Sequence, residues 1–309
     1  MSRGLDSPVR WLGIDIGGTN IKWALVCGPE VRATGSILTP RTGEQDVVAC
    51  VARLINEHAG GIAGAGVTVP GHVDPSTGRT GIVPNLPGQW RGFPLGEALA
   101  QATGRQVAML NDARAFALAE LRLGAASDLR GAVFVVIGTG VGGAVMLDGV
   151  LLGGPAGRAG EVGHVSVVPD GPPCGCGARG CVDAVAGGAG LVAAASPLGA
   201  ATRPERLTPA DVFAAAADGD PLATGAVERG AGALAHGVAN VCALMGVSNV
   251  ILGGGLSGLY PGLPDVIHRR LTMIAPLIGP ALVRLSRFTD HSAAIGAALG
   301  AQMTHLEQP

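Results

Sequence analysis

Two stretches of this sequence place a turn of glycine and threonine between two apolar runs. The first stretch, residues 12–26, turns at Gly17-Gly18-Thr19, and the second, residues 133–146, turns at Gly138-Thr139-Gly140. Apolar runs of this kind around a glycine turn predict β-hairpins. Successive amides in such a turn form an anion-binding concavity, and each threonine adds a hydroxyl donor. We therefore expect two halves of one fold that together hold a polyphosphate.

The composition limits the partners that such a chain can have. Its 309 residues suffice for two domains with a core each, and only 14% of them are charged, with a formal net charge of −2. A protein that binds nucleic acid needs a basic surface, so we expect no such partner. Residues 1–8 contain no apolar signal core, and glycines interrupt the longest apolar region, residues 132–152. We therefore expect a cytoplasmic protein without an export signal or a membrane span.

Strand-like and helix-like segments alternate along the chain, which predicts an α/β fold with a mixed sheet after the first hairpin. A short β-rich run at residues 65–69 leads into the loop that carries Gly71 and His72, and sites in open α/β sheets gather at such strand ends. A second polar loop begins at Asn85. The long segment 221–245 reads as a buried helix, and the Ala- and Gly-rich segment 292–303 reads as a closely packed one.

A buried strand at residues 107–110 delivers Asn111 and Asp112 to the start of a helix over residues 113–123. Phosphoryl transfer to a hydroxyl needs a carboxylate that accepts the proton, a metal ion that bridges phosphates, and positioning. Asp112 can supply this carboxylate and Asn111 a sugar-binding amide. Asp112 can equally be the N-cap of the helix, and the sequence leaves these two interpretations open.

The segment 157–188 shows little periodicity but many metal-ligand residues. One histidine and three cysteines are the number of ligands that a closed tetrahedral zinc site uses, and no position is left for water. We therefore predict a structural zinc ion. Its predicted ligands are His164, Cys174, Cys176 and Cys181. The remaining cysteines lie alone in apolar segments and are expected to be core thiols of a reducing compartment.

Two other phosphate-binding patterns, the dinucleotide-binding pattern and the Walker A pattern, must be compared with the glycine turns. Gly138, Gly140 and Gly143 satisfy the dinucleotide-binding pattern G-x-G-x-x-G, with Glu161 about twenty residues further on. That pattern requires a helix after the glycines, whereas the following residues read as a strand and a hairpin turn at Asp148-Gly149. The Walker A pattern of P-loop proteins is absent. Each glycine turn alone also fits a tight hairpin with no ligand.

Taken together, the motifs resemble the ROK sugar kinases (repressor, open reading frame, kinase), in particular their bacterial glucokinase-type members. The resemblance runs from residue 12 to about residue 301. The motifs that carry it are Asp15-Ile-Gly-Gly-Thr19, Asn111-Asp112, Gly138-Thr-Gly-Val-Gly-Gly143, Glu161-Val-Gly-His164 and Cys174-Gly-Cys176-Gly-Ala-Arg-Gly-Cys181.

The resemblance implies a duplicated actin-like ATPase fold of the ribonuclease H-like type, with two α/β domains around a cleft for ATP and sugar. We expect a smaller domain over residues 1–112, joined by the C-terminal helix 292–309, and a larger domain over residues 113–291 with the zinc loop 157–188. The chain would use ATP and Mg²⁺ to phosphorylate a hexose hydroxyl, with glucose or a close analogue at its 6-OH as the expected substrate. It would also act as a homodimer.

The resemblance also assigns roles to residues. Asp112 is the general base. Substrate contacts are expected from Gly71, His72, Asn85, Asn111, Asp112, Glu161, His164 and Asp183. ATP and Mg²⁺ contacts are expected from Asp15, Gly17, Gly18, Thr19, Asn20, Lys22, Gly138, Thr139, Gly140, Gly254 and Gly255, the last two on the adenosine side.

Two positions depart from the family pattern. Asp183 stands where the family usually has glutamate, and the shorter side chain would lengthen a direct sugar contact by roughly 1.5 Å. His72 lies in a loop that more often carries a small or apolar residue. These departures keep an amino sugar such as kanosamine or glucosamine, or a sugar-like cyclitol, open as the substrate.

Functions of other classes are less well supported by the sequence. The family includes transcriptional repressors with an N-terminal helix-turn-helix domain, but here the first hairpin begins near residue 12. A sugar-binding module without activity would be expected to lose Asp112 or a turn glycine, and both are present. Relatives that use polyphosphate as donor typically lack the cysteine cluster. We therefore expect an enzyme that uses ATP.

Overall fold

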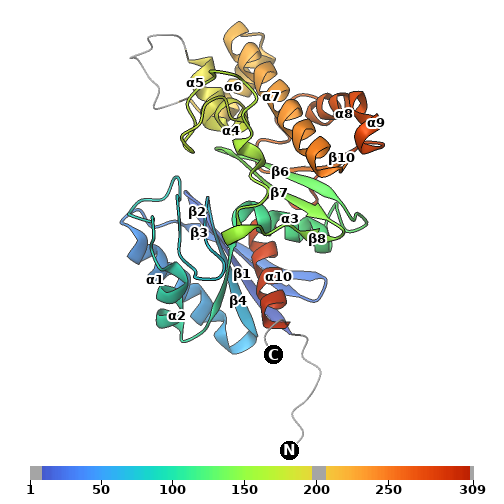
Figure 1. The fold of residues 1–309 in the computed structure, drawn as a ribbon. Helices are drawn as coiled ribbons and strands as arrows, with labels where there is room; N and C mark the ends of the chain where they lie inside the picture. The colour runs from blue at the N-terminus through green and yellow to red at the C-terminus, as the bar shows by residue number, and fades with distance from the viewer. Residues whose placement is uncertain (1–8, 197–206, 307–309) are drawn as a thin grey trace, which may run out of the picture. The chain divides into compact units, whose positions relative to one another are not determined.

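The computed structural model describes residues 9–196 and 207–306, and the chain divides into two compact units (Figure 1). Unit 1 comprises Met1–Gly124, Gly153–Arg158 and His291–Pro309, and unit 2 comprises Ala125–Leu152 and Ala159–Asp290. Residues 1–8, where the sequence predicts no export signal, lie outside the described part. Within the described part, no helix is long and apolar enough to span a membrane.

Unit 1 is built on a five-stranded mixed sheet with the strand order β3-β2-β1-β4-β5. The strands are β1 (Arg10–Ile16), β2 (Asn20–Cys27), β3 (Glu30–Leu38), β4 (Gly64–Val69) and β5 (Val107–Asn111). The first three strands pair antiparallel, and β4 and β5 continue the sheet in parallel to β1. This arrangement confirms the predicted first hairpin and the mixed sheet predicted after it.

The two faces of this sheet are covered differently. Leu12, Ile14 and Ile16 share one core with apolar residues of α1 (Glu44–His58) and α2 (Leu95–Thr103). On β1 and β4, Gly13 and Gly66 are paired neighbours, and a Cβ atom on either would collide with the backbone of α10 (Ser292–Leu306). The missing side chains let α10 lie directly on the sheet, beside α3 (Asp112–Leu123) (Figure 1).

Unit 2 contains a second five-stranded mixed sheet, with the order β10-β9-β6-β7-β8. The strands are β6 (Ala132–Ile137), β7 (Val141–Leu147), β8 (Val150–Leu151), β9 (Asn249–Gly253) and β10 (Leu282–Leu285). β6, β7 and β8 pair antiparallel, and β9 and β10 are parallel to β6. Strand for strand, this is the topology of unit 1, so the two sheets confirm the predicted duplicated fold.

The helices of unit 2 form its core with β6 and β9. The α-helices are α4 (Val182–Ala186), α5 (Gly188–Ala195), α6 (Pro209–Ala217), α7 (Pro221–Met245), α8 (Leu263–Met273) and α9 (Ala275–Ile278). The longest of them, α7, begins where the Asp220 side chain accepts hydrogen bonds from two backbone amides and ends at Gly246 in a left-handed conformation. Three short 3-10 turns, η1 (Ala59–Gly61), η2 (Pro155–Gly157) and η3 (Val162–His164), complete the described elements.

The domain boundary at residue 112 stays a prediction, and the compact units of the structure follow from their internal contacts. The helix α3 and the segment Gly153–Arg158 belong to unit 1. The reason is packing, because a Cβ atom on Gly296 of α10 would lie 1.7 Å from the Ala115 oxygen of α3. The two helices therefore form one layer. The strand that follows the predicted hairpin turn at Asp148-Gly149 is short, since β8 ends at Leu151.

Candidate functional site

The first glycine turn, between β1 and β2, is held by hydrogen bonds that occupy its carbonyl groups. The Gly17 amide donates to the Asn20 oxygen at 3.0 Å, the Thr39 amide to the Thr19 oxygen at 3.0 Å, and the Thr39 hydroxyl to the Gly17 oxygen at 2.6 Å. Among the described residues, the amides of Gly18 and Thr19 have no hydrogen-bond partner. The turn therefore presents two backbone donors, as a phosphate group requires.

Asp15 lies two residues before this turn, and its Cα atom pairs with that of Lys22 across the hairpin. The Thr68 hydroxyl donates to Asp15 Oδ1 at 2.7 Å. Burial raises the pKa of Asp15, while the Thr68 hydrogen bond and the charges of Lys22 and His291 lower it in part. A half-buried carboxylate of this kind gains stability from a nearby divalent cation, whose preferred ligands are oxygens.

The loop that carries Asn85 packs against the first turn. Asn85 has a left-handed backbone with φ of 66°, and a Cβ atom on Gly18 would lie 2.8 Å from its backbone oxygen. Gly18 is therefore required for the contact between the loop and the turn. This contact places the backbone of Asn85, predicted to bind substrate, beside the predicted phosphate site.

The structure separates the roles of Asn111 and Asp112 at the start of α3. Asn111 is the N-cap residue, because its Oδ1 accepts a hydrogen bond from the Arg114 amide at 3.1 Å, and its Nδ2 donates to the Gly71 oxygen. Asp112 is the first helical residue, it is half-buried, and its Oδ1 accepts from the Ala113 amide at 2.8 Å. The capping role that the sequence left open for Asp112 thus belongs to Asn111.

His72 lies in the loop after β4, next to the segment Gly153–Arg158. Its Nε2 lies 3.0 Å from the Ala156 oxygen and 3.2 Å from Nε of Arg158. Gly71, which precedes it, has φ of 79°, and a Cβ atom there would lie 2.3 Å from the Ile82 oxygen. Glycine is therefore needed to turn the chain so that the Gly71 oxygen meets Asn111 and the His72 ring meets Arg158.

In unit 2, the second and third glycine turns lie side by side. The Gly138 amide donates to the Gly140 oxygen at 2.8 Å, which closes the turn between β6 and β7. Gly254, at the end of β9, has φ of 87°, and a Cβ atom on it would lie 2.4 Å from the oxygen of Ile137. The Leu256 amide donates to that same oxygen at 3.0 Å. The predicted phosphate and adenosine contacts of unit 2 therefore meet at the end of β6.

The loop that carries Glu161 and His164 packs directly on β7. A Cβ atom on Gly163 would lie 1.8 Å from the Val141 oxygen, and one on Gly143 would lie 2.5 Å from the Val162 side chain. His164 points its Nε2 toward Glu161, 4.0 Å from Oε2. Its other ring nitrogen, Nδ1, lies 3.6 Å from Sγ of Cys174. His164 therefore connects a carboxylate on one side with the cysteine cluster on the other.

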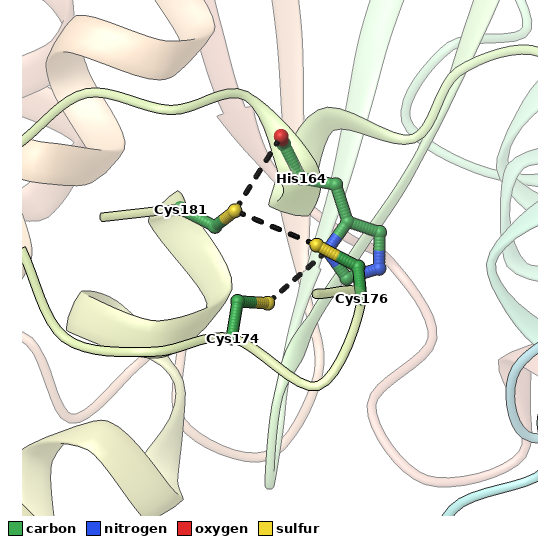
Figure 2. A group of neighbouring side chains, drawn as sticks. All are labelled: His164, Cys174, Cys176 and Cys181. Carbon is green, nitrogen blue, oxygen red and sulfur yellow. Dashed lines mark hydrogen bonds between the residues drawn. The ribbon is translucent and has the colours of Figure 1, made fainter. Parts of the chain in front are cut away.

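The four predicted zinc ligands converge (Figure 2). The ligand atoms of His164, Cys174, Cys176 and Cys181 all lie within 4.8 Å of one another. The Sγ atoms of Cys176 and Cys181 are 3.8 Å apart, and tetrahedral bonds of about 2.3 Å to zinc would separate two sulfur atoms by about 3.8 Å. The Cys174–His164 separation of 3.6 Å also matches one sulfur and one nitrogen ligand. The cluster fits a tetrahedral zinc ion.

The cysteine thiols of the cluster are in different surroundings. Burial raises the pKa of Cys181 to about 12, with smaller effects from Cys176 and Cys174. A hydrogen bond from the Ala178 amide lowers the pKa of Cys176, the exposed member. A zinc ion binds thiolates and stabilises them in place of their protons.

The carboxylate of Asp183, predicted to bind substrate, is turned toward the second glycine turn. Its Oδ1 accepts a hydrogen bond from the Val141 amide at 2.7 Å, and its Oδ2 lies 3.7 Å from Sγ of Cys174. A Cβ atom on Gly140 would lie 2.3 Å from Oδ1. Oδ1 is thus engaged within unit 2, and Oδ2 faces the cysteine cluster.

Sequence reasoning missed three side chains that support the predicted residues. Thr39 and Thr68 are buried and donate to Gly17 and Asp15, and Arg158 contacts His72. Each supporting residue is more than 20 positions away from its partner in the sequence. No local pattern could have identified them.

The chain with this geometry is similar to known proteins. The model of the ROK family matches residues 11–303. An N-acetylmannosamine kinase from Haemophilus influenzae is 31% identical over 302 residues, which cover 97% of this chain and 98% of that protein.

Two solved structures have a similar fold. The ROK hexokinase of Thermus thermophilus is 32% identical and superposes with a TM-score of 0.83, covering 97% of this chain and 100% of that one. A ROK family glucokinase from Streptomyces griseus, solved in complex with glucose and AMPPNP, is 30% identical with a TM-score of 0.79, covering 95% and 99% of the two chains.

Proposed function

Because the chain belongs to the ROK family and is a sugar kinase, we propose that it transfers the γ-phosphoryl group of ATP to a hexose hydroxyl with Asp112 as the general base. The 6-OH of glucose or of a close analogue is the expected acceptor. The general base must accept the proton of this hydroxyl as the phosphoryl group is transferred.

The main observation that supports this proposal is that Asn111 and Asp112 have different roles at the start of α3. Asn111 caps the helix, so the capping role does not explain why Asp112 is aspartate. The first turn of a helix stabilises a negative charge, which suits a carboxylate that must accept a proton. Asn111 also holds Gly71 and so orders the loop that carries His72.

The glycine turns fit the phosphates of ATP. The amides of Gly18 and Thr19 in unit 1 point to this role, as do the Thr19 and Thr139 hydroxyls, and Gly254 and Gly255 are assigned to the adenosine. Mg²⁺, when bound with ATP, would neutralise phosphate charge. Asp15, together with Asn20 and Lys22 at the start of β2, provides the charged and polar groups that such an ion and the phosphates need.

We assign a structural role to the zinc ion. All four ligand positions are filled by protein atoms, so no position is left for a reacting water molecule. The ion would fix the His164 ring, whose Nε2 faces Glu161. Glu161 and His164 are then ordered before they bind sugar hydroxyls, which lowers the entropy cost of binding.

An N-acylated amino sugar is a second candidate substrate. Nε2 of His72 cannot donate to the Ala156 oxygen and accept from Arg158 at the same time. When it donates, Nε of Arg158 becomes a donor for another acceptor, such as an acyl carbonyl group. This surrounding is unfavourable for a free ammonium group, because Arg158 carries a positive charge.

The decisive experiment compares the wild type with Asp112→Asn. ADP release is measured against glucose, mannose, N-acetylmannosamine, N-acetylglucosamine, glucosamine and kanosamine, with polyphosphate as the alternative donor. The variant should keep its sugar affinity in calorimetry and lose about 10²–10⁴-fold in kcat. Near-normal turnover would remove Asp112 from its role. A wild type without turnover on any sugar would overturn the proposed activity.

We also propose that the enzyme is cytoplasmic and forms a homodimer. None of the six cysteines, all of which lie in the described residues, forms a disulfide, which suits the reducing cytoplasm. Three large apolar side chains, those of Leu244, Met273 and Leu277, are more than 70% exposed at the ends of α7, α8 and in α9. Such surface favours a homodimer, and light scattering after size exclusion would measure its mass.

A further inference from the structure

The end of the zinc loop and the start of α5 are hydrogen-bonded to three residues at the second glycine turn, Gly138, Thr139 and Val141. The amides of Gly188 and Ala189, at the start of α5, donate to the oxygens of Gly138 and Thr139 at 2.9 and 3.0 Å. The carboxylate of Asp183, in α4, accepts from the Val141 amide at 2.7 Å. The turn is thus fixed from one side by two donors and one acceptor.

These bonds determine which amides of the turn remain for a ligand. The Gly138 amide is used within the turn, and the Val141 amide is used by Asp183. In the part of the chain that the structure describes, the amides of Thr139 and Gly140 have no hydrogen-bond partner. These are the two positions at the tip, equivalent to Gly18 and Thr19 in the first turn. Asp183 therefore leaves the tip open while it holds the base of the turn.

The length of the Asp183 side chain matters for this contact. A Cβ atom on Gly140 would lie 2.3 Å from Oδ1, so the carboxylate rests against the backbone of the turn. A glutamate would extend the carboxylate by roughly 1.5 Å, which is more than the space that this contact leaves. Aspartate and the glycine opposite it are thus matched in size.

The zinc cluster is the other support of Asp183. Cys181 is the residue before α4 and Asp183 is the second residue of that helix, with Oδ2 at 3.7 Å from Sγ of Cys174. A fixed Cys181 therefore fixes the helical turn from which the Asp183 side chain extends. The chain of contacts runs from the cysteine cluster through α4 to the Val141 amide.

We propose that Asp183 is a positioning residue for nucleotide binding, which shapes the second glycine turn and makes nucleotide affinity depend on the zinc loop. This inference rests on the proposed function, because the turn must bind phosphates for it to hold. It differs from the sugar contact that the sequence predicts at this position, since Oδ1 of the carboxylate is engaged by the Val141 amide inside unit 2.

The test measures the affinity of zinc-loaded, full-length protein for AMPPNP with Mg²⁺, and separately for glucose and N-acetylmannosamine, by calorimetry. Asp183→Ala should weaken AMPPNP binding about 10-fold and leave sugar affinity within about 2-fold, because only the turn loses a partner. Asp183→Asn keeps an oxygen acceptor and should lose less than about 3-fold. Asp183→Glu should resemble the alanine variant.

The matched control is Asp220→Ala, which removes an N-cap carboxylate elsewhere in unit 2. It should lower the melting temperature without changing either affinity. Weaker AMPPNP binding in this control, equal to that of Asp183→Ala, would show that general destabilisation is the cause and would overturn the proposal. A loss of sugar affinity with normal AMPPNP affinity in Asp183→Ala would make Asp183 a sugar ligand instead.

Amide hydrogen exchange separates this inference from the proposed function. Peptides that cover residues 139–144 should exchange faster in Asp183→Ala than in the wild type, with no ligand present. Unchanged exchange would overturn the contact itself. If the wild type binds no AMPPNP, the proposed function fails and the nucleotide role falls with it, whereas faster exchange would still establish the support of the turn by Asp183.

Discussion

The two glycine turns occupy the same place in two sheets of the same topology, yet they are supported by different parts of the chain. In unit 1, β3 pairs with β2 back to Asn20, so Thr39 follows directly beside the turn. In unit 2, the equivalent strand β8 pairs only at its two residues, next to Met146 and Leu147, far from the turn in register. The helices α4 and α5 provide the support instead.

The difference teaches where each turn obtains its shape. The first turn is held by the neutral side chain and the amide of Thr39, directly after β3, so its support comes from the same three antiparallel strands that form it. The second is held by a carboxylate and two helix amides that follow the cysteine cluster. One turn is therefore supported by its own strands, and the other by the segment that follows the cysteine cluster.

The largest effect is expected from Asp15, the carboxylate two residues before the first turn. Asp15→Asn should reduce turnover by at least about 10³-fold if the carboxylate serves Mg²⁺, and it should also stabilise the folded protein. Burial raises the pKa of Asp15 above that of the unfolded chain. The folded state then holds its proton more tightly, so ionisation costs stability as the pH rises from about 4 through the folded pKa.

Thermal melting between pH 4.5 and pH 8.5 checks whether the ionisation of Asp15 lowers the stability of the folded protein. The Asn variant should melt higher than the wild type at pH 8, and the difference should shrink as the pH falls. The exposed Asp218 offers a matched control, and Asp218→Asn should show neither effect. A variant of Asp15 that melts lower at pH 8 would contradict the assignment of burial as the dominant cause.

A smaller effect, confined to unit 2, is expected from loss of the metal. Cys176→Ser should lose zinc and weaken sugar binding by about 10–100-fold, because His164 and Glu161 lose their fixed positions. Hydrogen exchange should rise in peptides of the second turn and stay unchanged in those of the first. Cys242→Ser changes a buried thiol outside the cluster and should retain zinc. Sugar affinity that survives zinc removal would show that the metal does not support the site.

The smallest effect should come from the neutral support of the first turn. Thr39→Val keeps the shape of the side chain but removes the hydroxyl that donates to Gly17, which should cost about 1 kcal/mol in the free energy of unfolding. Thr39→Ser retains the hydroxyl and should lose less. Urea denaturation of both variants measures the difference. An equal loss in the two would show that the methyl group, and not the hydrogen bond, supports the turn.

Local patterns predicted most of the fold and the metal cluster. Both hairpins follow from apolar runs around glycine, and the cluster of one histidine and three cysteines follows from residue type and spacing. The strand β10 was not predicted, because its four residues are too short to show an alternating pattern. The helix α5 was also missed, since its small apolar residues give no clear helical face.

Contacts between segments that lie far apart in the chain could not be predicted from local sequence patterns. Asn111 and Asp112 are both good N-cap residues, and only the backbone geometry shows that Asn111 takes this position. The sugar contact of Asp183 stays a prediction, and the hydrogen bond of its carboxylate to the Val141 amide, 42 residues away, could not be read from the local pattern. The boundary between the units depends on how α10 packs with α3, which small residues permit but do not specify.

The pairing of Gly13 and Gly66 beneath α10 also affects how the protein is made. The helix that completes unit 1 lies at the end of the chain, after all of unit 2 has been synthesised. At 5–20 residues per second, the ribosome needs about 10–40 s to add the roughly 180 residues between α3 and the end of α10. During that time the sheet of unit 1 lacks the cover of α10 on one face and is a potential chaperone substrate.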